Sequence, residues 1–248
     1  MDDLLLAWFR ENGRDLPWRA TRDPYAILVS EVMLQQTQAE RVVPRWVAWL
    51  ERWSTAEALA AASPAQVIVA WQGLGYNRRA VNLHRAAQVV AERGWPDDLT
   101  ELPGVGPYTA AAIRNQAFGE PVLPVDTNVR RIQERTGHEF GPEALQALFD
   151  LGATVCIARI PRCGVCPLAE ACPSRGRRYE PLRRQSRFEG SFRQRRASVL
   201  RLVAAGTRAV GELDGDAVAA LARDGLVEVQ GDLVALPGGF TARRAATG

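Results

Sequence analysis

The chain has 248 residues, 47% of them hydrophobic, and its formal net charge at pH 7 is only +3. This length suits one large domain, or a main domain with a small second one, and the apolar content allows a buried core. The sequence has no run of 18 apolar residues, so we expect no membrane span, and its acidic start is unlike a secretory signal, so we expect a cytoplasmic protein.

Basic residues are unevenly distributed along the chain. All 31 are Arg; residues 1–174 carry 17 Arg against 20 acidic residues, whereas residues 175–248 carry 14 against 8. The densest part, residues 175–196, holds nine Arg and two Glu. Because Arg pairs with phosphate oxygens in a bidentate fashion, this segment favours contact with nucleic acid phosphates, with a solvated linker as the alternative.

Helical periodicity dominates the sequence up to Cys156. It predicts an amphipathic helix from about residue 4 that ends near Gly13, a strongly apolar helix over residues 23–38, and a further helix over residues 78–94 that Gly94 ends. No alternating strand pattern competes with these helices before residue 195.

Two short helices are expected between these segments. Ser54 with Glu57, and Ser63 with Gln66, have the spacing of capping boxes, in which each side chain bonds the backbone of the other residue. The second short helix is expected to end at the two glycines of the stretch QGLGY.

The stretch LPGVGPYTAAAIRNQAFG, residues 102–119, predicts a site for an anion. Gly104 and Gly106 permit a sharp turn with positive φ, and a helix from Thr109 would point its free N–H groups at that turn. Two such glycines are often no more than a turn. With helices on both sides, however, the pattern predicts a helix-hairpin-helix that binds one DNA backbone phosphate without reading sequence.

All four cysteines lie within 17 residues, in the spacing C-x6-C-x2-C-x5-C. In a cytosolic protein such a cluster favours a metal centre over disulfides. Zinc sites more often pair two C-x2-C units across a longer gap, so the single run favours an iron–sulfur cluster, with zinc as the alternative. The expected ligands are Cys156, Cys163, Cys166 and Cys172.

The end of the chain has a different character. Two helical stretches after Arg196 are followed by LVEVQGDLVALPG, which predicts a hairpin turning at Gln230 to Asp232. Helix, helix and hairpin in this order predict a small winged-helix-like module over residues 197–240, followed by a frayed tail, residues 241–248.

Several motifs together resemble one family. The hairpin at 102–113, PVDTNVRR just after it and the cysteine run look like the helix-hairpin-helix DNA glycosylases of the endonuclease III superfamily. Within that superfamily, LPWR, SEVMLQQTQ, GLGY and NLH resemble the adenine DNA glycosylases.

This resemblance implies an all-α, two-lobed fold with DNA across its cleft and a [4Fe-4S] cluster. It implies a glycosylase domain over residues 1–173, followed by an Arg-rich linker, residues 174–196. The expected partner is double-stranded DNA with a mismatched or damaged base pair, bound by a monomer near the nucleoid. Excision of adenine opposite 8-oxoguanine or guanine is the activity implied.

Two carboxylates are candidates for the chemistry. Glu31 lies in an apolar helix, where burial would raise its pKa and make it a usable general acid; an exposed carboxylate is the alternative. Asp126 opens a helix, where Asp is also a routine N-cap. The resemblance implies that Glu31 is the catalytic acid, that Asp126 stabilises the developing positive charge on the sugar, and that Asn128 hydrogen-bonds near them.

Tyr108 indicates which reaction is absent. In the superfamily that this sequence resembles, members that also cleave the DNA strand carry a nucleophilic Lys at this position of the hairpin. This chain has Tyr there and no Lys anywhere. Because β-elimination through a Schiff base needs an amine, we expect base excision without efficient strand cleavage.

The remaining DNA contacts are implied by the resemblance alone. Gln36 and Tyr76 match residues that wedge into the duplex, with Thr37 beside them; a helix-surface Gln and a core Tyr are the alternatives. Trp18 and Arg19 match groups around the flipped adenine, and Gln146 matches a residue that reads its edge.

The sequence differs from the family pattern at several places, so other functions remain as alternatives. The segment 132–150 is shorter than usual, and residues 175–248 are too few for the Nudix-like domain that recognises 8-oxoguanine in longer members. Asn77 and the DTN of residues 126–128 leave room for a thymine or uracil mismatch glycosylase. A non-catalytic iron–sulfur protein that binds DNA is the alternative from another class.

Overall fold

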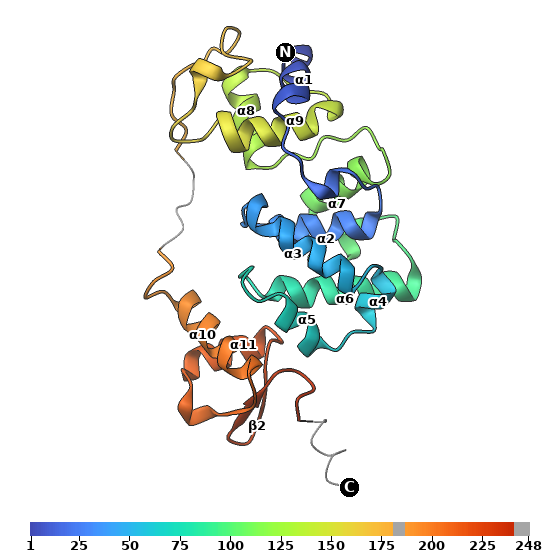
Figure 1. The fold of residues 1–248 in the computed structure, drawn as a ribbon, viewed down its shortest axis with the longest axis vertical. Coiled ribbons are helices and arrows are strands. Elements are labelled where there is room, and N and C mark those ends of the chain that lie inside the picture. Colours follow the sequence, from blue (N-terminus) through green and yellow to red (C-terminus); the bar gives the residue numbers. More distant parts are fainter. Residues whose placement is uncertain (181–186, 241–248) are drawn as a thin grey trace. The chain divides into compact units, whose positions relative to one another are not determined.

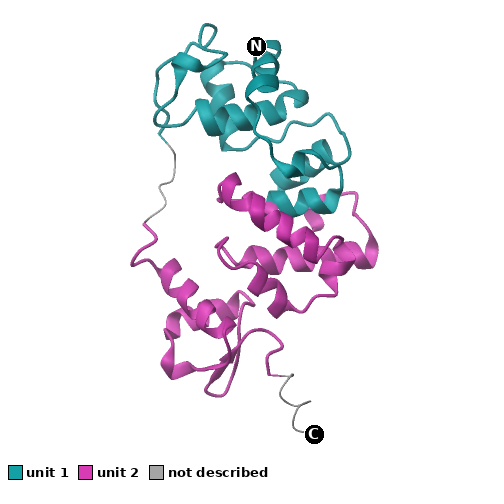
Figure 2. Cartoon of the chain, in the orientation of Figure 1, with its two compact units in different colours: residues 1–31, 105–184 teal, residues 32–104, 185–248 magenta. Residues whose placement is uncertain are grey.

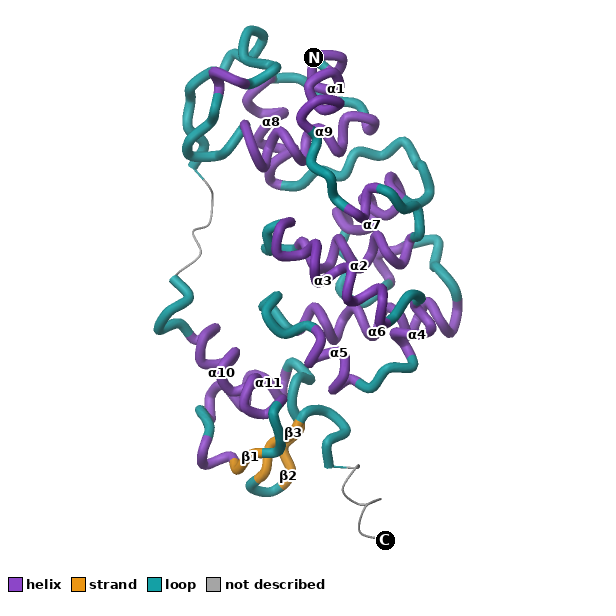
Figure 3. The backbone as a smooth tube through the Cα atoms, in the orientation of Figure 1, coloured by secondary structure: helices purple, strands orange, loops and turns teal. Residues whose placement is uncertain are grey.

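The computed structural model describes residues 1–180 and 187–240, so residues 181–186 of the expected linker and the expected tail, 241–248, lie outside the described residues. The chain forms two compact units (Figures 1 and 2). Unit 1 comprises residues 1–31 and 105–184, and unit 2 comprises residues 32–104 and 185–248. The expected all-α class is confirmed, with a small three-stranded sheet as the only β structure in the described ranges (Figure 3).

Unit 1 is built from helices around one apolar core. Leu5, Ile132, Leu148 and other fully buried residues pack together there, so the first helix contacts segments more than 120 residues away in sequence. Its longer elements are α1 (Asp2–Asn12), the first part of α2 (Pro24–Leu34), α7 (Pro107–Gln116), α8 (Thr127–Thr136) and α9 (Leu145–Asp150). Its short turns are η1 (Pro17–Arg19), η3 (Pro142–Ala144), the π-helical η4 (Leu151–Val155) and η5 (Cys163–Val165).

The first part of unit 2 is also helical. Its elements are α3 (Ala39–Arg52), α4 (Ala56–Ala60), α5 (Pro64–Ala70), α6 (Arg78–Arg93) and η2 (Leu99–Glu101). The apolar face of α6 is buried, and Gly94, at φ 77°, ends this helix as expected. The capping box of α5 is confirmed, since Ser63 and Gln66 each accept a hydrogen bond from the other's backbone N–H.

The second part of unit 2 carries the sheet. Its elements are α10 (Phe192–Ala204), β1 (Arg208–Ala209), η6 (Val210–Glu212), α11 (Gly215–Arg223), β2 (Glu228–Gln230) and β3 (Leu233–Ala235). The two expected helices and the expected hairpin are present, and β1 adds an antiparallel third strand in the order β1-β3-β2 (Figure 3). Ile68 of α5 belongs to the same buried cluster as Val199 and Leu221.

Three expected helix ends are wrong. The N-cap of α4 is Thr55, whose hydroxyl accepts from the N–H of Ala58, so Ser54 does not form the capping box. The helix expected over residues 23–38 ends at Leu34. The C-cap of α5 is Trp71 in a right-handed conformation, and the two glycines of QGLGY, at φ 92° and 73°, lie further along the loop.

The hairpin also differs from its prediction in one detail. Gly104 has the expected positive φ, 82°, but Gly106 is extended, at φ −94° and ψ 177°. Gly106 precedes a proline, whose ring disfavours the helical region for the residue before it, and it serves as the N-cap of α7. The helix therefore begins at Pro107, two residues before the expected Thr109. Among the described residues no helix has the length and apolar character needed to cross a membrane.

Candidate active site

Glu31 is a buried carboxyl group in unit 1. It lies in α2 among buried apolar neighbours and is 5% exposed. The Nε2 of Gln116 donates a hydrogen bond to its Oε1 at 3.0 Å. Burial raises the pKa of Glu31 to about 7; hydrogen bonds from Gln116 and Tyr108 oppose that rise, and the charge of Asp126 adds to it. Glu31 therefore keeps its proton to a much higher pH than an exposed carboxyl group does.

Asp126 is a carboxylate with several hydrogen-bond donors. It is the N-cap of α8, and its Oδ1 accepts from the backbone N–H groups of Asn128 and Val129 at 2.8 and 2.7 Å. Its Oδ2 accepts from the Nδ2 of Asn128 at 3.0 Å. Asp126 thus lies at a helix N-terminus with both oxygens held by hydrogen-bond donors, an arrangement that suits a group placed to face a neighbouring positive charge. The expected capping role is thus confirmed.

Tyr108 is close to both carboxyl groups. It lies in the first turn of α7, and its hydroxyl is hydrogen-bonded to Glu31. Burial raises the pKa of Tyr108 above its ordinary value, and the charges of Glu31 and Asp126 raise it further, so the phenol stays neutral. The fold thus gathers three groups from α2, α7 and the start of α8, far apart in sequence, into one site of unit 1.

Asn128 connects Asp126 with the cysteine-bearing part of unit 1. Its Oδ1 accepts from the Nη2 of Arg131 at 2.8 Å. The Nε of Arg131 donates to the carbonyl of Cys156 at 2.8 Å, and its Nη2 also donates to the carbonyl of Gly152 at 2.9 Å. A Cβ at Gly152 would lie 2.6 Å from the Cβ of Asn128, so glycine is required there. Arg131 was not singled out from the sequence, although the PVDTNVRR motif contains it.

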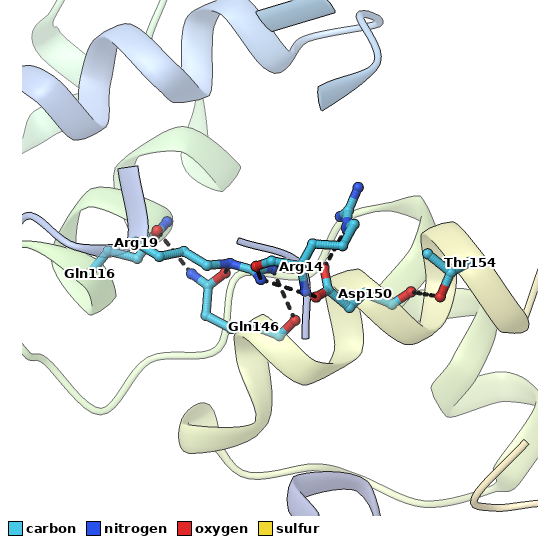
Figure 4. A network of polar contacts seen from close by, with 6 residues as sticks. All are labelled: Arg14, Arg19, Gln116, Gln146, Asp150 and Thr154. Carbon is cyan, nitrogen blue, oxygen red and sulfur yellow. Dashed lines mark hydrogen bonds and ion pairs between the residues drawn. The ribbon is translucent and has the colours of Figure 1, made fainter. Parts of the chain in front are cut away.

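Arg19 and Gln146 belong to a second polar network (Figure 4). The Nε of Arg19 donates to the Oε1 of Gln146 at 2.8 Å, and its Nη2 forms an ion pair with Asp150 at 2.7 Å. The Nε2 of Gln146 donates to the Oε1 of Gln116 at 3.0 Å. Arg14 also binds Asp150, through its Nε at 2.8 Å and its backbone N–H at 2.7 Å. Both polar atoms of the Gln146 side chain are thus engaged within the protein.

Trp18, the remaining residue implied to surround the base in unit 1, is only 4% exposed and lies in η1. Of the residues in these networks, the sequence analysis missed Arg14, Gln116 and Asp150. Asp150 offered a signal, because it is the one charged residue inside a largely apolar stretch, LQALFDLGATV. Such a carboxylate needs a buried partner.

In unit 2 the two expected wedge residues share an unusual backbone. In the described part of the chain, Gln36 (φ 56°) and Tyr76 (φ 45°) are the only non-glycine residues with positive φ. Both side chains are exposed, Tyr76 by 41%. This left-handed region is costly for residues with a Cβ and tends to persist only where the surrounding structure enforces it. Thr37, next to Gln36, is half-buried.

Arg79 holds both of these loops. Its guanidinium donates to the carbonyls of Val32, Met33 and Gln35 at 2.7, 3.0 and 2.7 Å. It also donates to the carbonyls of the loop before Tyr76, at Leu74 (3.1 Å) and Gly75 (3.0 Å), and to the hydroxyl of Thr37 (3.3 Å). Burial lowers the pKa of Arg79 to about 10, so it remains charged at neutral pH. One buried cation therefore fixes the backbone beside each strained residue.

The hairpin residues have unequal roles. A Cβ at Gly104 would lie 2.8 Å from the Cβ of Asn82, so both the φ angle and the close approach require glycine. Gly106 is exposed and has open space around it, and it gives α7 no side-chain cap. The backbone N–H groups at the start of α7 therefore have no side-chain acceptor from the N-cap residue. The side chain of Thr109 is 3% exposed, so it packs inside unit 1.

The four cysteines line one cavity in unit 1 and form no disulfide. Burial raises the pKa of Cys166, and the charges of Cys156, Cys163 and Cys172 add to that rise. Arg135 also lines the cavity; its Nη1 donates to the Sγ of Cys156 at 3.4 Å, and its buried Nη2 has no hydrogen-bond partner among the described residues. An all-thiol donor set with a buried cation beside it fits an anionic sulfur-bridged cluster.

Within the described ranges, no group of three or more His, Cys, Asp or Glu side chains is placed to hold a metal ion.

Known proteins of DNA repair are similar to this chain in sequence and in structure. Residues 29–147 match the model of the HhH-GPD superfamily of base excision DNA repair proteins. An adenine DNA glycosylase of Mycobacterium tuberculosis is 44% identical over 80% of this chain and 77% of its own length. That of Mycolicibacterium smegmatis is 42% identical over 86% of this chain and 84% of its own length. The solved structure of a thermostable thymine-DNA glycosylase matches with a TM-score of 0.63 and 28% identity, over 70% of this chain and 94% of that one.

Proposed function

This chain belongs to the adenine DNA glycosylases of the HhH-GPD superfamily, and on that premise we propose that it excises adenine mispaired with 8-oxoguanine or guanine from double-stranded DNA. The supporting observation is a pair of carboxyl groups in unit 1 with different surroundings. Burial raises the pKa of Glu31 to about 7, whereas the oxygens of Asp126 accept three hydrogen bonds at the start of α8. An acid beside a carboxylate is the requirement for hydrolysis of a glycosidic bond.

The reaction follows from these two groups. The carboxyl of Glu31 gives its proton to N7 of the adenine as the bond between N9 and the sugar breaks, and the bonding electrons leave with the base. The carboxylate of Asp126 stabilises the positive charge that develops on the sugar. Water then adds to the sugar carbon and gives up a proton to the carboxylate of Glu31, which yields free adenine and an abasic site and restores the acid. Asn128 orients Asp126 through its 3.0 Å hydrogen bond.

The same site supports excision without strand cleavage. Tyr108 stays neutral beside two carboxyl groups and carries no amine, and the chain contains no Lys. A Schiff base with the abasic sugar therefore has no side-chain nucleophile.

The DNA contacts are assigned to groups in both units. We assign the phosphate site to the hairpin at Gly104 and Gly106, and duplex insertion to Gln36 and Tyr76. The flipped purine is assigned to the surroundings of Trp18, Arg19 and Gln146. We propose that the protein acts as a monomer in the cytoplasm near the nucleoid.

We assign a [4Fe-4S] cluster to Cys156, Cys163, Cys166 and Cys172. When bound, such a cluster ties its loop together through four thiolate bonds to iron. The cavity between the thiols and the unpaired Nη2 of Arg135 support this assignment.

A single-turnover assay on four duplexes tests the function. Each duplex carries A·8-oxoguanine, A·G, T·G or U·G, and alkali after the reaction cleaves any abasic site. We expect wild type to release product from the two adenine duplexes, and Glu31→Gln and Asp126→Asn to do so at least about 10²-fold more slowly. Product from T·G or U·G alone would instead support the mismatch thymine or uracil glycosylase, and binding without product would support a non-catalytic protein.

A further inference from the structure

Gln116 has no role in the mechanism above, yet its side chain touches the catalytic acid. It is the last residue of α7 and is half-buried. Its Nε2 lies 3.0 Å from the Oε1 of Glu31, and its Oε1 lies 3.0 Å from the Nε2 of Gln146. An amide so placed presents either a donor or an acceptor to Glu31, depending on which way it is turned.

The orientation of the Gln116 amide is determined by the hydrogen bonds at the other end of the network, beginning with Arg19 (Figure 4). The guanidinium of Arg19 has only donors, so the atom of Gln146 that faces it at 2.8 Å must be the carbonyl oxygen. The NH2 of Gln146 then faces Gln116 and takes its carbonyl oxygen, which turns the NH2 of Gln116 toward Glu31. Each hydrogen bond in the series therefore fixes the next one.

Asp150 anchors the series. It is fully buried, and its carboxylate accepts both Nη atoms of Arg19, at 3.0 and 2.7 Å. Burial alone would raise the pKa of Asp150, but hydrogen bonds from Arg19 and Arg14 lower it below its ordinary value. The buried carboxylate thus stays charged and keeps the guanidinium in one orientation.

A donor on Oε1 has two consequences for Glu31. In the neutral acid it leaves Oε2 as the oxygen that carries the proton. After the proton has gone to the base, the carboxylate retains a hydrogen bond, which stabilises the charged form. The donor therefore opposes the effect of burial on this group.

Building on the function proposed above, we propose that Gln116 is a positioning residue for Glu31, held in its donating orientation by the series Gln146, Arg19 and Asp150. The hydrogen bond from Gln116 opposes the preference of the buried Glu31 for its protonated form. It also stabilises the carboxylate that is left after proton transfer. Replacing Gln116 by an apolar residue should therefore keep Glu31 protonated to higher pH.

The test compares wild type with Gln116→Leu, and uses Asn115→Leu as the matched control. Asn115 is the preceding amide of α7, and its Nδ2 donates to the carbonyl of Val122 at 2.9 Å rather than to Glu31. Single-turnover excision from an A·8-oxoguanine duplex is measured from pH 5 to 9. We expect the alkaline fall in rate to move up by about one pH unit in Gln116→Leu only, as for loss of one hydrogen bond to a charged group.

A second measurement does not depend on activity. The carboxyl resonance of Glu31, assigned by its absence from Glu31→Gln, is followed by 13C NMR through the same pH range. The titration of Glu31 should move upward in Gln116→Leu and by a smaller amount in Gln146→Leu, where the amide of Gln116 is free to turn. An unchanged titration in Gln116→Leu would overturn the proposal even if excision persists. If the titration of Glu31 shifts in Gln116→Leu but wild type excises no base, the coupling between Gln116 and Glu31 would be supported and the glycosylase function rejected.

Discussion

The pKa of Glu31 links the active site to stability. It rises from 4.5 to about 7 on folding, so between these values the folded chain binds a proton that the unfolded chain does not. This stabilising contribution is complete below pH 4.5 and is lost as the pH rises through 7. Glu31→Gln cannot ionise, so it should gain stability relative to wild type from pH 5 to pH 8, by up to about 3 kcal/mol. Urea unfolding at the two pH values measures this difference, and a difference that does not change with pH would contradict it.

Tyr108 is the residue that we propose to prevent strand cleavage after the base has been excised. Tyr108→Lys would place an amine beside Glu31 and Asp126, where its charge would be favourable. We expect this variant to become trapped on abasic DNA by borohydride, whereas wild type and Tyr108→Phe should not. Efficient trapping of wild type through an internal side chain would show that another nucleophile exists.

Single residues were predictable where their surroundings in the sequence were distinctive. Glu31 stands inside an apolar helix, and its burial followed from that pattern. Gln116 stands at a helix end, where no periodicity distinguishes an amide that points inward. Arg79 shares the buried face of α6 with Leu83. A cation at an apolar position of a helix indicates a buried, functional side chain, and the sequence analysis did not use this indication.

At the scale of elements, hydrogen bonds from Arg79 hold the loop after α2, which contains Gln36, and the loop before α6, which contains Tyr76. Gln36→Gly relieves a left-handed residue, a strain of about 1 kcal/mol that the greater freedom of glycine in the unfolded chain partly offsets. We expect little change in thermal stability and at least a tenfold loss in affinity for A·8-oxoguanine DNA, because the wedge side chain is gone.

Gln38→Gly is the matched control for that loop. Gln38 is an exposed glutamine two residues away with an ordinary φ of −69°. It should bind the mismatched duplex like wild type. Equal affinity of the Gln36 and Gln38 variants in a fluorescence anisotropy titration would remove Gln36 from the DNA contact.

Most elements followed from periodicity, and their ends did not. The helices over α1 and α6, and the hairpin of β2 and β3, lie where the sequence predicts them. The predicted ends of α4 and α5 were wrong because nearby Ser, Thr and Gly residues offer several equivalent caps. The helix α2 ends earlier than predicted, just before Gln36 adopts a positive φ. The strand β1 has only two residues, too few for an alternating pattern to show.

At the scale of the whole molecule, the cysteine spacing predicted a metal centre with four thiol ligands, and in unit 1 the four cysteines line one cavity. If it holds a [4Fe-4S] cluster, purified protein should be coloured and contain about four iron atoms per chain. Cys163→Ser should lose iron and thermal stability, whereas Ser174→Ala, in the same cavity, should keep both. Colourless protein with one zinc ion would contradict the assignment.

Long-range packing was beyond the reach of the sequence patterns. Ile68 shares a buried cluster with Val199 and Leu221, and Leu5 shares another with Leu148. Periodicity identifies which face of each helix is apolar but not which distant face covers it. The meeting of Glu31, Tyr108 and Asp126 in unit 1 is of the same kind, and only the family resemblance implied it.

The rate of adenine excision as a function of pH tests the central claim, that a buried Glu31 acts as the acid beside Asp126. In single turnover on an A·8-oxoguanine duplex, the wild-type rate constant should be level below about pH 7 and then fall tenfold per pH unit. Glu31→Gln should be slower by about 10²- to 10⁴-fold and show no such bend. A wild-type rate constant that stays level to pH 9, or excision by Glu31→Gln at the wild-type rate, would contradict the account.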